Sequence, residues 1–397
     1  MPYFDAIGRM GSAKSLDFPP RVRKKGMKGN KMKASRRSYR LAGISLLAVA
    51  SLVLAGCSSD SDTSSADTSS DAPVQVTLIT KDSTNPFFVT MQEGGKVEAE
   101  KYGVDLTIAS GKKDGDEDGQ IQAIEQAIAR GDQGILILPN GPTVENAMAK
   151  AREAGLYVIA LDTPPADSNT VDITFATDNR EAGTLIGTWA AAQLDGKPAV
   201  IALLDAFTDK VILVDIGRDQ GFLEGMGIDV ADGQKTGDEA ETGTYSGGKG
   251  GDYTIVCNEA SEGNEDGGRT GMETCLTKNP DINVVYTINE PAAVGANAAL
   301  TAAGIADSVI MVSVDGGCAG VQNVKDGIIG ATSQQYPLLM VTLGMEAIAN
   351  IVRTGETPSA SDGLDFFNTG VALVTDKPVD GLESIDTTEA TAICWGK

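Results

Sequence analysis

The sequence predicts an α/β fold built on doubly wound parallel sheets, and three observations indicate it. Apolar strands and helical segments alternate from residue 74 almost to the end of the chain. The strands are apolar on consecutive residues, as 284–288 and 309–314 illustrate, which is typical of strands that helices cover on both faces. The 397 residues include 47 glycines and only 5% aromatic residues, which suits two domains with many tight turns.

We expect strand and helix to follow one another along the whole body. The expected strands cover residues 74–80, 105–109, 134–138, 157–161, 174–176, 199–204, 253–257, 284–288, 309–314 and 330–333. The expected helices cover residues 86–102, 119–130, 143–154, 180–194, 215–226, 267–278, 292–303 and 338–353. Pro86 suits the first turn of a helix, and Gly304 suits a left-handed C-cap.

Polar side chains follow two of these strands where each strand ends. Asn289 and Asp315 come directly after or at the end of the strands at 284–288 and 309–314. In doubly wound sheets the ligand crevice lies at the carboxyl ends of the strands. An amide beside a carboxylate can pair with a neutral ligand rich in hydroxyl groups, because the amide both donates and accepts. The alternative is that both residues only cap the turns after their strands.

Two aromatic residues, Phe87 and Phe88, stand side by side at the start of the helix at 86–102. Adjacent residues of a helix cannot both face the core, so we expect at least one ring over the crevice. An aromatic face there would stack on the C–H face of a sugar ring. The alternative is that both rings pack between domains.

The composition argues against several classes of function. The chain has no histidine, which excludes Ser-His and Cys-His catalysis and histidine metal sites, so we do not expect an enzyme. No expected strand is followed by a Gly-x-Gly-x-x-Gly or Walker A motif, so we expect no nucleotide and no cofactor. The net charge is −23, which disfavours binding of nucleic acid.

Residues 1–56 are expected to form a signal peptide with a basic leader. They carry 12 Lys and Arg residues against two acidic residues. A basic segment at 31–40 precedes an apolar segment at 41–54, which is too short for a stable membrane span. A start at Met27 or Met32 would shorten the leader, and an uncleaved anchor helix is the alternative to cleavage.

Leu54-Ala55-Gly56-Cys57 resembles the lipobox of bacterial lipoproteins. The resemblance implies cleavage before Cys57 and lipidation of its sulfur. Residues 58–72 are mostly Ser, Thr and Asp, so 57–73 should be the lipidated cysteine and a flexible tether. The globular body would then be held at the outer face of the cytoplasmic membrane by its lipid.

Four cysteines remain besides Cys57, and an even number in an exported body indicates two disulfides. We expect Cys257–Cys275, which would join a strand to the next helix, and Cys318–Cys394, which would fix the chain end. Other pairings and free buried thiols stay open, and the spacing does not suit zinc.

Two acidic loops, residues 114–118 and 259–266, invite comparison with calcium sites. The first has alternating carboxylates, but its glycine does not stand where an EF-hand requires it. We expect a solvated acidic surface at these loops and no metal site.

The order of polar and aromatic residues resembles the type I periplasmic sugar-binding proteins, the family of the ribose-binding protein. The likeness is carried by Asn85-Pro86-Phe87-Phe88, Leu161-Asp162-Thr163-Pro164, Arg218-Asp219-Gln220-Gly221-Phe222, Ile288-Asn289-Glu290-Pro291, Val314-Asp315-Gly316-Gly317-Cys318 and Ser333-Gln334-Gln335-Tyr336-Pro337. It spans residues 74 to about 378 and is nearest to the fructose-binding subgroup of importer lipoproteins.

The resemblance implies two Rossmann-like lobes joined by a three-segment hinge, with a monosaccharide in the cleft between them. The N-terminal lobe would comprise 74–177 and 336–366, and the C-terminal lobe 178–335 and 367–397. The ligand-binding residues that it implies are Asn85, Phe87, Phe88, Asp162, Thr177, Arg218, Asn289, Asp315 and Gln335.

The resemblance leaves the sugar and one contact open. Thr163 stands where the ribose-binding protein has arginine, which removes a fork-shaped donor and argues against ribose. Tyr245 and Tyr253 are both candidates for an aromatic contact from the C-terminal lobe.

The family implies a monomeric receptor that delivers its sugar, with fructose as first candidate, to an ABC permease in the membrane. A receptor of the same fold that reports to a membrane sensor is the alternative. A third possibility is a glycosidase that uses the carboxylates of Asp162 and Asp315. A glycosidase would hydrolyse its substrate, whereas a receptor only binds it.

Overall fold

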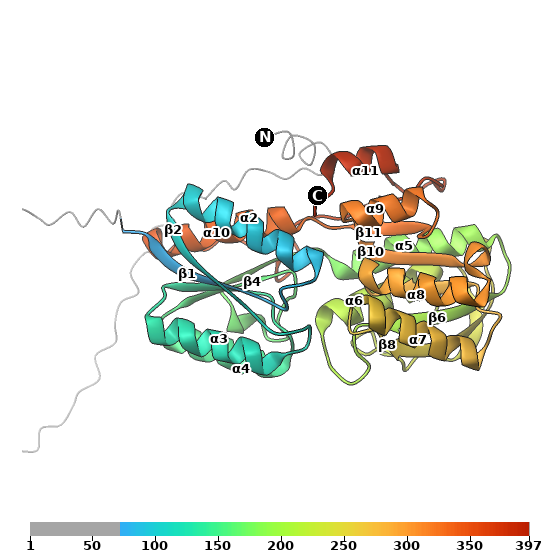
Figure 1. Cartoon of the computed structure of the whole chain (residues 1–397), viewed down its shortest axis with the longest axis horizontal. Coiled ribbons are helices and arrows are strands. Elements are labelled where there is room, and N and C mark those ends of the chain that lie inside the picture. The colour runs from blue at the N-terminus through green and yellow to red at the C-terminus, as the bar shows by residue number, and fades with distance from the viewer. Residues whose placement is uncertain (1–71, 397) are drawn as a thin grey trace, which may run out of the picture. The chain divides into compact units, whose positions relative to one another are not determined.

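A computed structural model describes residues 72–396 (Figure 1). These residues form two α/β lobes, each built on its own sheet. The expected signal peptide, Cys57 and the expected tether up to residue 71 lie outside the described residues. Within the described part of the chain, no helix combines the length and the apolar character that a membrane crossing requires.

The first sheet has six strands in the order β12-β5-β4-β3-β1-β2, and its pairings are parallel. Its strands are β1 (Val74–Thr80), β2 (Val104–Ser110), β3 (Gly134–Ile137), β4 (Tyr157–Leu161), β5 (Ile173–Ala176) and β12 (Phe367–Asn368). One face carries two helices, and the opposite face two more: α2 (Pro86–Tyr102) with α10 (Pro337–Thr354), and α3 (Glu117–Arg130) with α4 (Pro142–Glu153) (Figure 1). The strands are therefore buried on both faces, as their apolar runs predict.

The second sheet has seven strands in the order β13-β11-β10-β9-β6-β8-β7. Its strands are β6 (Ala199–Asp205), β7 (Thr242–Tyr245), β8 (Gly251–Ala260), β9 (Val284–Thr287), β10 (Ile310–Asp315), β11 (Ala331–Gln334) and β13 (Ala372–Val374). Its two faces carry α5 (Asn179–Leu194) with α6 (Leu213–Met226), and α7 (Glu265–Lys278) with α8 (Glu290–Ala303). Unlike the parallel sheet that was expected, it has an antiparallel strand at each edge, β7 and β13.

Several short elements do not follow from the apolar pattern. Besides β7, β12 and β13, these are α9 (Cys318–Lys325), α11 (Thr387–Ile393) and the 3₁₀ turns η1 (Ser168–Thr170) and η2 (Ala306–Ser308). β7 (TGTY) and β12 (FN) contain no continuous apolar run, and β13 (ALV) is only three residues long, so hydrophobic periodicity does not reveal them.

The chain passes between the two sheets three times. The crossings lie between β5 and α5, between β11 and α10, and between β12 and β13. The last crossing comes later than expected, because Phe367 and Asn368 pair with β5 in the first sheet rather than belonging to the second lobe. The three crossing segments stand side by side where the lobes meet, which is the arrangement of a hinge.

Helices α5 and α6 approach each other closely because glycines line their contact. A methyl group added at Gly183 would overlap the backbone carbonyl oxygen of Arg218, and one at Gly187 would overlap that of Phe222. Only glycine leaves room for such contact between two helix backbones. This packing fixes the position of α6, which carries Arg218 into the cleft.

Both expected disulfides are present. Cys257 on β8 is bonded to Cys275 on α7, with 5.6 Å between their Cα atoms. Cys318 at the start of α9 is bonded to Cys394, with a Cα distance of 4.9 Å. The second disulfide holds the C-terminal residues beside the end of β10, where Cys318 N–H donates to the Trp395 carbonyl at 2.9 Å.

Candidate functional site

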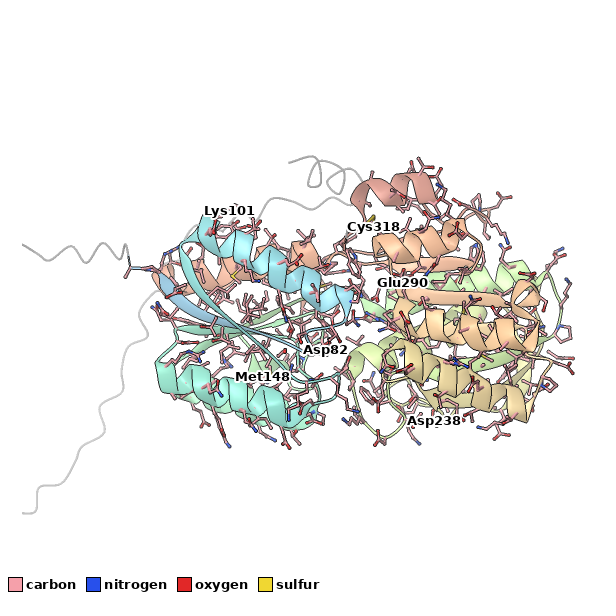
Figure 2. The ribbon with its side chains drawn as sticks, in the orientation of Figure 1. Asp82, Lys101, Met148, Asp238, Glu290 and Cys318 are labelled. Carbon is pink, nitrogen blue, oxygen red and sulfur yellow. A yellow bond between two sulfur atoms is a disulfide. The ribbon has the colours of Figure 1, made fainter. Side chains whose placement is uncertain are left out.

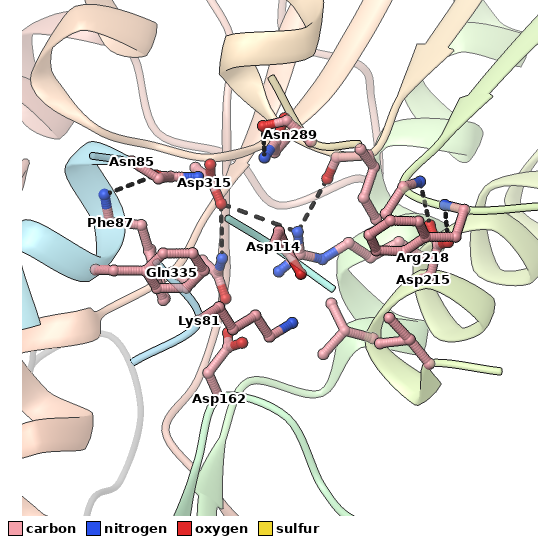
Figure 3. A pocket seen from close by; sticks show the side chains of 17 residues that line it. Lys81, Asn85, Phe87, Asp114, Asp162, Asp215, Arg218, Asn289, Asp315 and Gln335 are labelled. Atoms are coloured by element: carbon pink, nitrogen blue, oxygen red, sulfur yellow. Dashed lines mark hydrogen bonds and ion pairs between the residues drawn. The ribbon is translucent and has the colours of Figure 1, made fainter. Parts of the chain in front are cut away.

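A pocket lies between the lobes, at the carboxyl ends of strands from both sheets (Figure 3). The structure brings eight of the nine expected ligand-binding residues into its lining: Asn85, Phe87, Phe88, Asp162, Arg218, Asn289, Asp315 and Gln335. Thr177 is the exception. Its hydroxyl lies in the hinge, 3.4 Å from the Gly370 carbonyl oxygen, in a separate hollow lined also by Asp178 and Arg180.

Asp315 lines this pocket between Gln335 and Arg218. Its backbone φ is 141°, a conformation that side chains rarely adopt, at the end of β10. Its Oδ1 atom accepts a hydrogen bond from Gln335 Nε2 at 2.8 Å and lies 3.9 Å from Arg218 Nη1 (Figure 3). Burial raises the pKa of Asp315 to about 6, although Arg218 and the Gln335 bond oppose the rise.

Arg218 is held rigidly by two further bonds. Its Nε donates to Asn179 Oδ1 at 2.8 Å, and its Nη1 donates to the Ile288 carbonyl at 2.9 Å. Asn179 opens α5, so the closely packed pair α5 and α6 positions the guanidinium as a unit. A rigid planar donor of this kind suits recognition of adjacent hydroxyl oxygens.

Asn289 serves its helix as well as the pocket. Its Oδ1 accepts from Ala292 N–H at 3.1 Å, which caps α8, and its Nδ2 donates to the Gly263 carbonyl at 2.9 Å. Asn289 therefore caps its helix and also lines the pocket, so it does not only cap the turn, and the Asp315 carboxylate pairs with pocket side chains. The bond to Gly263 also ties the end of β9 to the loop after β8.

Asp162 and Gln335 present free acceptors to the pocket. Asp162 has a left-handed backbone, φ 62°, and its Oδ2 accepts from the Thr163 hydroxyl at 2.8 Å. Its Oδ1 is buried without a donor, and so is Gln335 Oε1. Buried acceptors of this kind are costly unless a ligand donor reaches them.

Phe87 and Phe88 both belong to the hydrophobic core of the first lobe, so the expectation that adjacent helix residues cannot both face the core is wrong, although both rings also line the pocket. Phe87 and Phe88 line the pocket from α2 with their rings edge to face at 5.6 Å, and Phe87 also packs against Trp395 at 5.3 Å. From the C-terminal lobe, Phe207 lines the pocket.

Tyr245 and Tyr253 are not the aromatic contact of that lobe. Both rings are buried in the core under α5 and α6, and their hydroxyls donate to the backbone carbonyls of Lys197 and Ala240. They point inward because they sit on the covered face of β7 and β8, whereas Phe207 comes from the loop after β6.

Three charged residues that were not among the expected ligand-binding residues also line the pocket: Lys81, Asp114 and Asp215. Asp215 receives hydrogen bonds from the N–H groups of Ala206 and Phe207, and burial raises its pKa to about 6. Lys81 follows directly after β1, a position at a strand end that could have revealed it.

Asp114 corrects the expectation of a solvated acidic loop at 114–118. Its Oδ1 atom is buried without a donor, and burial raises the pKa of its carboxyl. The loop after β2 turns this carboxylate towards the cleft. A hydrogen bond from Gly115 N–H to Asn140 Oδ1, 3.0 Å long, holds the loop in this conformation.

Glu290 is buried near Asp315 and accepts hydrogen bonds from the turn after β10. Its two carboxylate oxygens accept from Gly316 N–H at 2.8 Å and Gly317 N–H at 3.1 Å, and Thr332 donates to it at 2.9 Å. Burial and the nearby Asp315 charge raise the pKa of Glu290 to about 8. Glu290 thereby fixes the strained backbone at Asp315.

The chain is similar in sequence to known binding proteins. Residues 76–357 match the family model described as periplasmic binding protein domain. The chain is 28% identical over 292 residues to the ribose import binding protein RbsB of Salmonella typhimurium strain LT2, covering 73% of this chain and 88% of the relative. It is 26% identical over 336 residues to the D-ribose/D-allose-binding protein of Pseudomonas aeruginosa PAO1, covering 82% and 97%.

Solved structures share the fold. A periplasmic solute binding protein from Actinobacillus succinogenes 130Z with bound D-allose has a TM-score of 0.63 at 22% identity, covering 80% of this chain and 99% of its own. A solute binding protein from Agrobacterium vitis with bound D-fucose has a TM-score of 0.65 at 23% identity, covering 81% and 100%. These relatives are binding proteins rather than enzymes. The chain belongs to the periplasmic binding protein domain family and has the fold of its type I sugar-binding members.

Proposed function

We propose that this chain is the extracytoplasmic substrate-binding component of a carbohydrate ABC importer. It binds a monosaccharide between its lobes and, as a monomer, delivers it to a membrane permease. A lipid on Cys57 holds it at the outer face of the cytoplasmic membrane. The family match and the sugar-binding relatives support the receptor function, and the lipobox resemblance at residues 54–57 supports the anchor.

The observation that carries this proposal is the set of pocket groups that have no protein partner. Asp114 Oδ1, Asp162 Oδ1 and Gln335 Oε1 are buried acceptors without donors. A sugar hydroxyl both donates and accepts hydrogen bonds. Several hydroxyls on one ring can therefore donate to these acceptors and at the same time accept hydrogen bonds from the Arg218 guanidinium. Phe87 in the same lining offers an aromatic surface for the C–H face of the ring.

D-Fructose is our first candidate for the sugar. Its support is the motif resemblance at the six segments quoted above and the presence of Thr163 in place of an arginine. Lys81 and Asp114 give this pocket additional polar groups, which favours a ligand with more hydroxyls than ribose. A missing or misplaced hydroxyl would leave a buried group unpaired, at about 1–3 kcal/mol each.

Movement of the two lobes about the hinge would allow the chain to bind the sugar and to release it to the permease. The lobes also touch across the mouth of the cleft, where Lys113 pairs with Glu262 at 2.9 Å and Lys210 Nζ donates to the Gly115 carbonyl at 3.0 Å. A ligand that bonds to both lobes favours the closed arrangement, because only that arrangement satisfies both sets of contacts. The permease would then recognise the surface that the closed lobes form together.

A thermal-shift screen tests this proposal. Residues 73–397 contain both sheets with all their covering helices, so a protein of this length is a suitable sample. The screen uses D-fructose, D-ribose, D-xylose, D-glucose, D-galactose, mannitol and myo-inositol. A ligand at 100 times its Kd should add about 2.7 kcal/mol, a rise of several degrees in Tm.

The variant Asp315→Ala provides the site control for the screen. One strong responder whose effect disappears in this variant would support both the sugar and the cleft. If no monosaccharide or polyol shifts the Tm of the parent protein, monosaccharide binding is wrong. A response that persists in Asp315→Ala would place the ligand elsewhere.

A further inference from the structure

The charges that line the pocket between the lobes are not balanced. The lining contains four aspartates and two basic residues: Asp114, Asp162, Asp215, Asp315, Lys81 and Arg218. In their ionised forms, these side chains leave a net charge of −2 in the pocket. A ligand that brings positive charge offsets this excess, whereas a neutral ligand does not.

Two of the four carboxylates already have partners in the protein. Asp315 Oδ1 accepts a hydrogen bond from Gln335 Nε2 at 2.8 Å and lies 3.9 Å from Arg218 Nη1. Asp215 accepts hydrogen bonds from two backbone N–H groups after β6, at 2.8 Å and 2.9 Å. The excess negative charge therefore lies on the remaining two aspartates, Asp114 and Asp162.

Asp114 and Asp162 lack such partners. Within residues 72–396, neither carboxylate has a Lys or Arg nitrogen within 4.0 Å. The Oδ1 atom of each is buried without a donor, and Asp162 is only 4% exposed. In the view of Figure 3, the side chain of Lys81 reaches into the pocket between the two carboxylates.

Lys81 does not compensate both carboxylates. It carries one positive charge and is itself buried. Burial, with the charges of Asp82 and Asp162, raises the pKa of Asp114, although the Lys81 charge opposes the rise. With Arg218 beside Asp315, at least one carboxylate of the pocket stays without a cation.

A second cavity adjoins the pocket at Asp114. It has a volume of about 360 Å³ and shares four lining residues with the pocket: Asn85, Asp114, Gly263 and Asp315. Asp114 therefore stands at the boundary between the two spaces. A substituent on a sugar ring in the pocket could extend past Asp114 into this cavity.

The second cavity is also acidic. Besides Asp114 and Asp315, its charged residues are Asp82, Lys113, Glu262, Glu265 and Glu290. Its one basic residue, Lys113, already pairs with Glu262 at 2.9 Å. Figure 2 labels Asp82 in the first lobe and Glu290 in the second, near the place where the lobes adjoin. A cleft lined by carboxylates attracts a cation and repels an anion.

An amino group suits Asp114 better than a hydroxyl does. A hydroxyl donates one hydrogen, whereas a protonated amine donates three and brings a full positive charge. A hydrogen bond between two charged groups is roughly twice as strong as one between neutral groups. The other hydroxyls of the same ring would remain free to pair with Arg218, Asp315 and Gln335.

We propose that the cleft prefers an amino sugar, a monosaccharide that carries a protonated amine, and that the Asp114 carboxylate binds this amine. The proposal rests on the proposed sugar-binding function and narrows it to a class of ligand. Asp114 is the partner of the amine because it lines both cavities and has no cation within 4.0 Å among the described residues. Asp162 Oδ1 then accepts a hydrogen bond from a neighbouring hydroxyl.

The test compares ligands that differ only in this group. The pairs are 1-amino-1-deoxy-D-fructose with D-fructose, D-glucosamine with D-glucose, and D-galactosamine with D-galactose. Calorimetric titration of residues 73–397 at pH 6.5 measures each affinity. In at least one pair the amino sugar should bind about tenfold more tightly or better, because a charged hydrogen bond replaces a weaker one.

Variants of the carboxylates assign the preference to its residue. Asp114→Asn removes the charge with little change of shape and should abolish the preference. Asp118→Asn, which changes an exposed carboxylate of the same segment, should leave it intact. Asp162→Asn should weaken both members of a pair alike, since this carboxylate receives a hydroxyl. Circular dichroism establishes that each variant is folded.

The pH dependence of the preference needs only the parent protein, so it applies even if Asp114→Asn does not fold. Amino groups of this kind lose their proton at about pH 8. The ratio of the two affinities in a pair should therefore fall between pH 6.5 and pH 9.5. The neutral sugar of each pair is the control, because titration of the protein affects both ligands.

Equal or tighter binding of the neutral sugar in all three pairs would overturn the proposal. A preference that persists in Asp114→Asn, or that does not change between pH 6.5 and pH 9.5, would overturn it as well. If neutral sugars bind and depend on Asp315 while no amino sugar is preferred, only the assignment of the amine is wrong. If no sugar of either kind binds, the proposed function is wrong too.

Discussion

Asp315 has a backbone φ of 141° and a buried carboxylate between Gln335 and Arg218. Glu290 makes this conformation possible, because it accepts both N–H groups of the following turn. The carboxyl groups of Asp315 and Glu290 thus lie close together in the interior, and repulsion from the Asp315 charge helps to raise the pKa of Glu290. A ligand hydroxyl that donates to Asp315 would stabilise its charged form, so binding and protonation are coupled.

The raised pKa of Glu290 predicts a pH dependence of stability. Its folded-state pKa is about 8, against 4.5 ordinarily, so the folded protein holds one more proton than the unfolded chain between these values. The free energy of unfolding should therefore fall as pH rises from about 4.5 to 8, by at most about 1.4 kcal/mol per pH unit from this group. Urea unfolding at pH 5.5, 6.5 and 7.5 measures the slope.

Glu290→Gln is the variant that isolates this contribution. Its slope between pH 5.5 and 7.5 should be smaller than that of the parent protein, because residue 290 no longer titrates. Glu383→Gln, an exposed carboxylate in the same lobe, should leave the slope unchanged. Equal slopes in parent and Glu290→Gln would mean that this carboxyl titrates normally.

At the scale of elements, the packing of α5 against α6 decides where Arg218 lies. Gly183→Ala would place a methyl group against the Arg218 carbonyl, so α6 must shift away from α5. We expect sugar affinity to fall about tenfold or more, because the guanidinium would lose its alignment with Asn179 and Asp315. Calorimetric titration with the sugar found in the screen measures the change.

Gly271→Ala is the matched control for that substitution. Gly271 lies on α7, where the added methyl would meet only the side chains of Leu204 and Glu259 within 3.4 Å. It should cost some stability but leave the affinity within a factor of about two. If Gly183→Ala binds as tightly as the parent, the glycine contact does not position Arg218.

Sequence patterns predicted most elements because long apolar runs and helix caps are local properties. The residues at strand ends and helix starts, such as Asp315 and Phe87, could be assigned to the cleft for the same reason. Asp114 and Phe207 could not, since their loops reach the pocket only through tertiary contacts. Tyr253 failed as a candidate because aromatic character does not reveal which sheet face a side chain occupies.

At the scale of the whole molecule, the C-terminal residues connect the two lobes a fourth time. Cys394 is bonded to Cys318 in the second lobe, while Trp395 packs on Phe87 and within the core of the first lobe. The Trp395 indole N–H donates to the Gln335 carbonyl at 3.0 Å, directly at a hinge crossing. The disulfide therefore supports both stability and the shape of the cleft.

Removing each disulfide separates these effects. Cys318→Ser/Cys394→Ser opens a cross-link with a sequence separation of 76 and should cost about 4 kcal/mol of stability. Cys257→Ser/Cys275→Ser, with a separation of 18, should cost about 3 kcal/mol. Urea unfolding measures both losses.

Only loss of the Cys318–Cys394 disulfide should weaken sugar binding, because only this disulfide holds Trp395 against Phe87. Calorimetric titration of both disulfide variants at a temperature where each is folded tests this difference. Equal affinities in the two variants would show that the chain end stabilises the fold without shaping the cleft.

Calorimetric titration of residues 73–397 with D-fructose, in the parent protein and in Asp315→Ala, tests most directly whether the cleft binds a monosaccharide. We predict one binding site per chain and a loss of affinity of at least tenfold in Asp315→Ala, since a buried hydrogen bond to a charged group contributes about 1.5–3 kcal/mol. If another monosaccharide binds instead and its affinity depends on Asp315 in the same way, fructose is the wrong sugar but the cleft is still the binding site. No binding of fructose or of any sugar in the screen would contradict the assignment of this cleft.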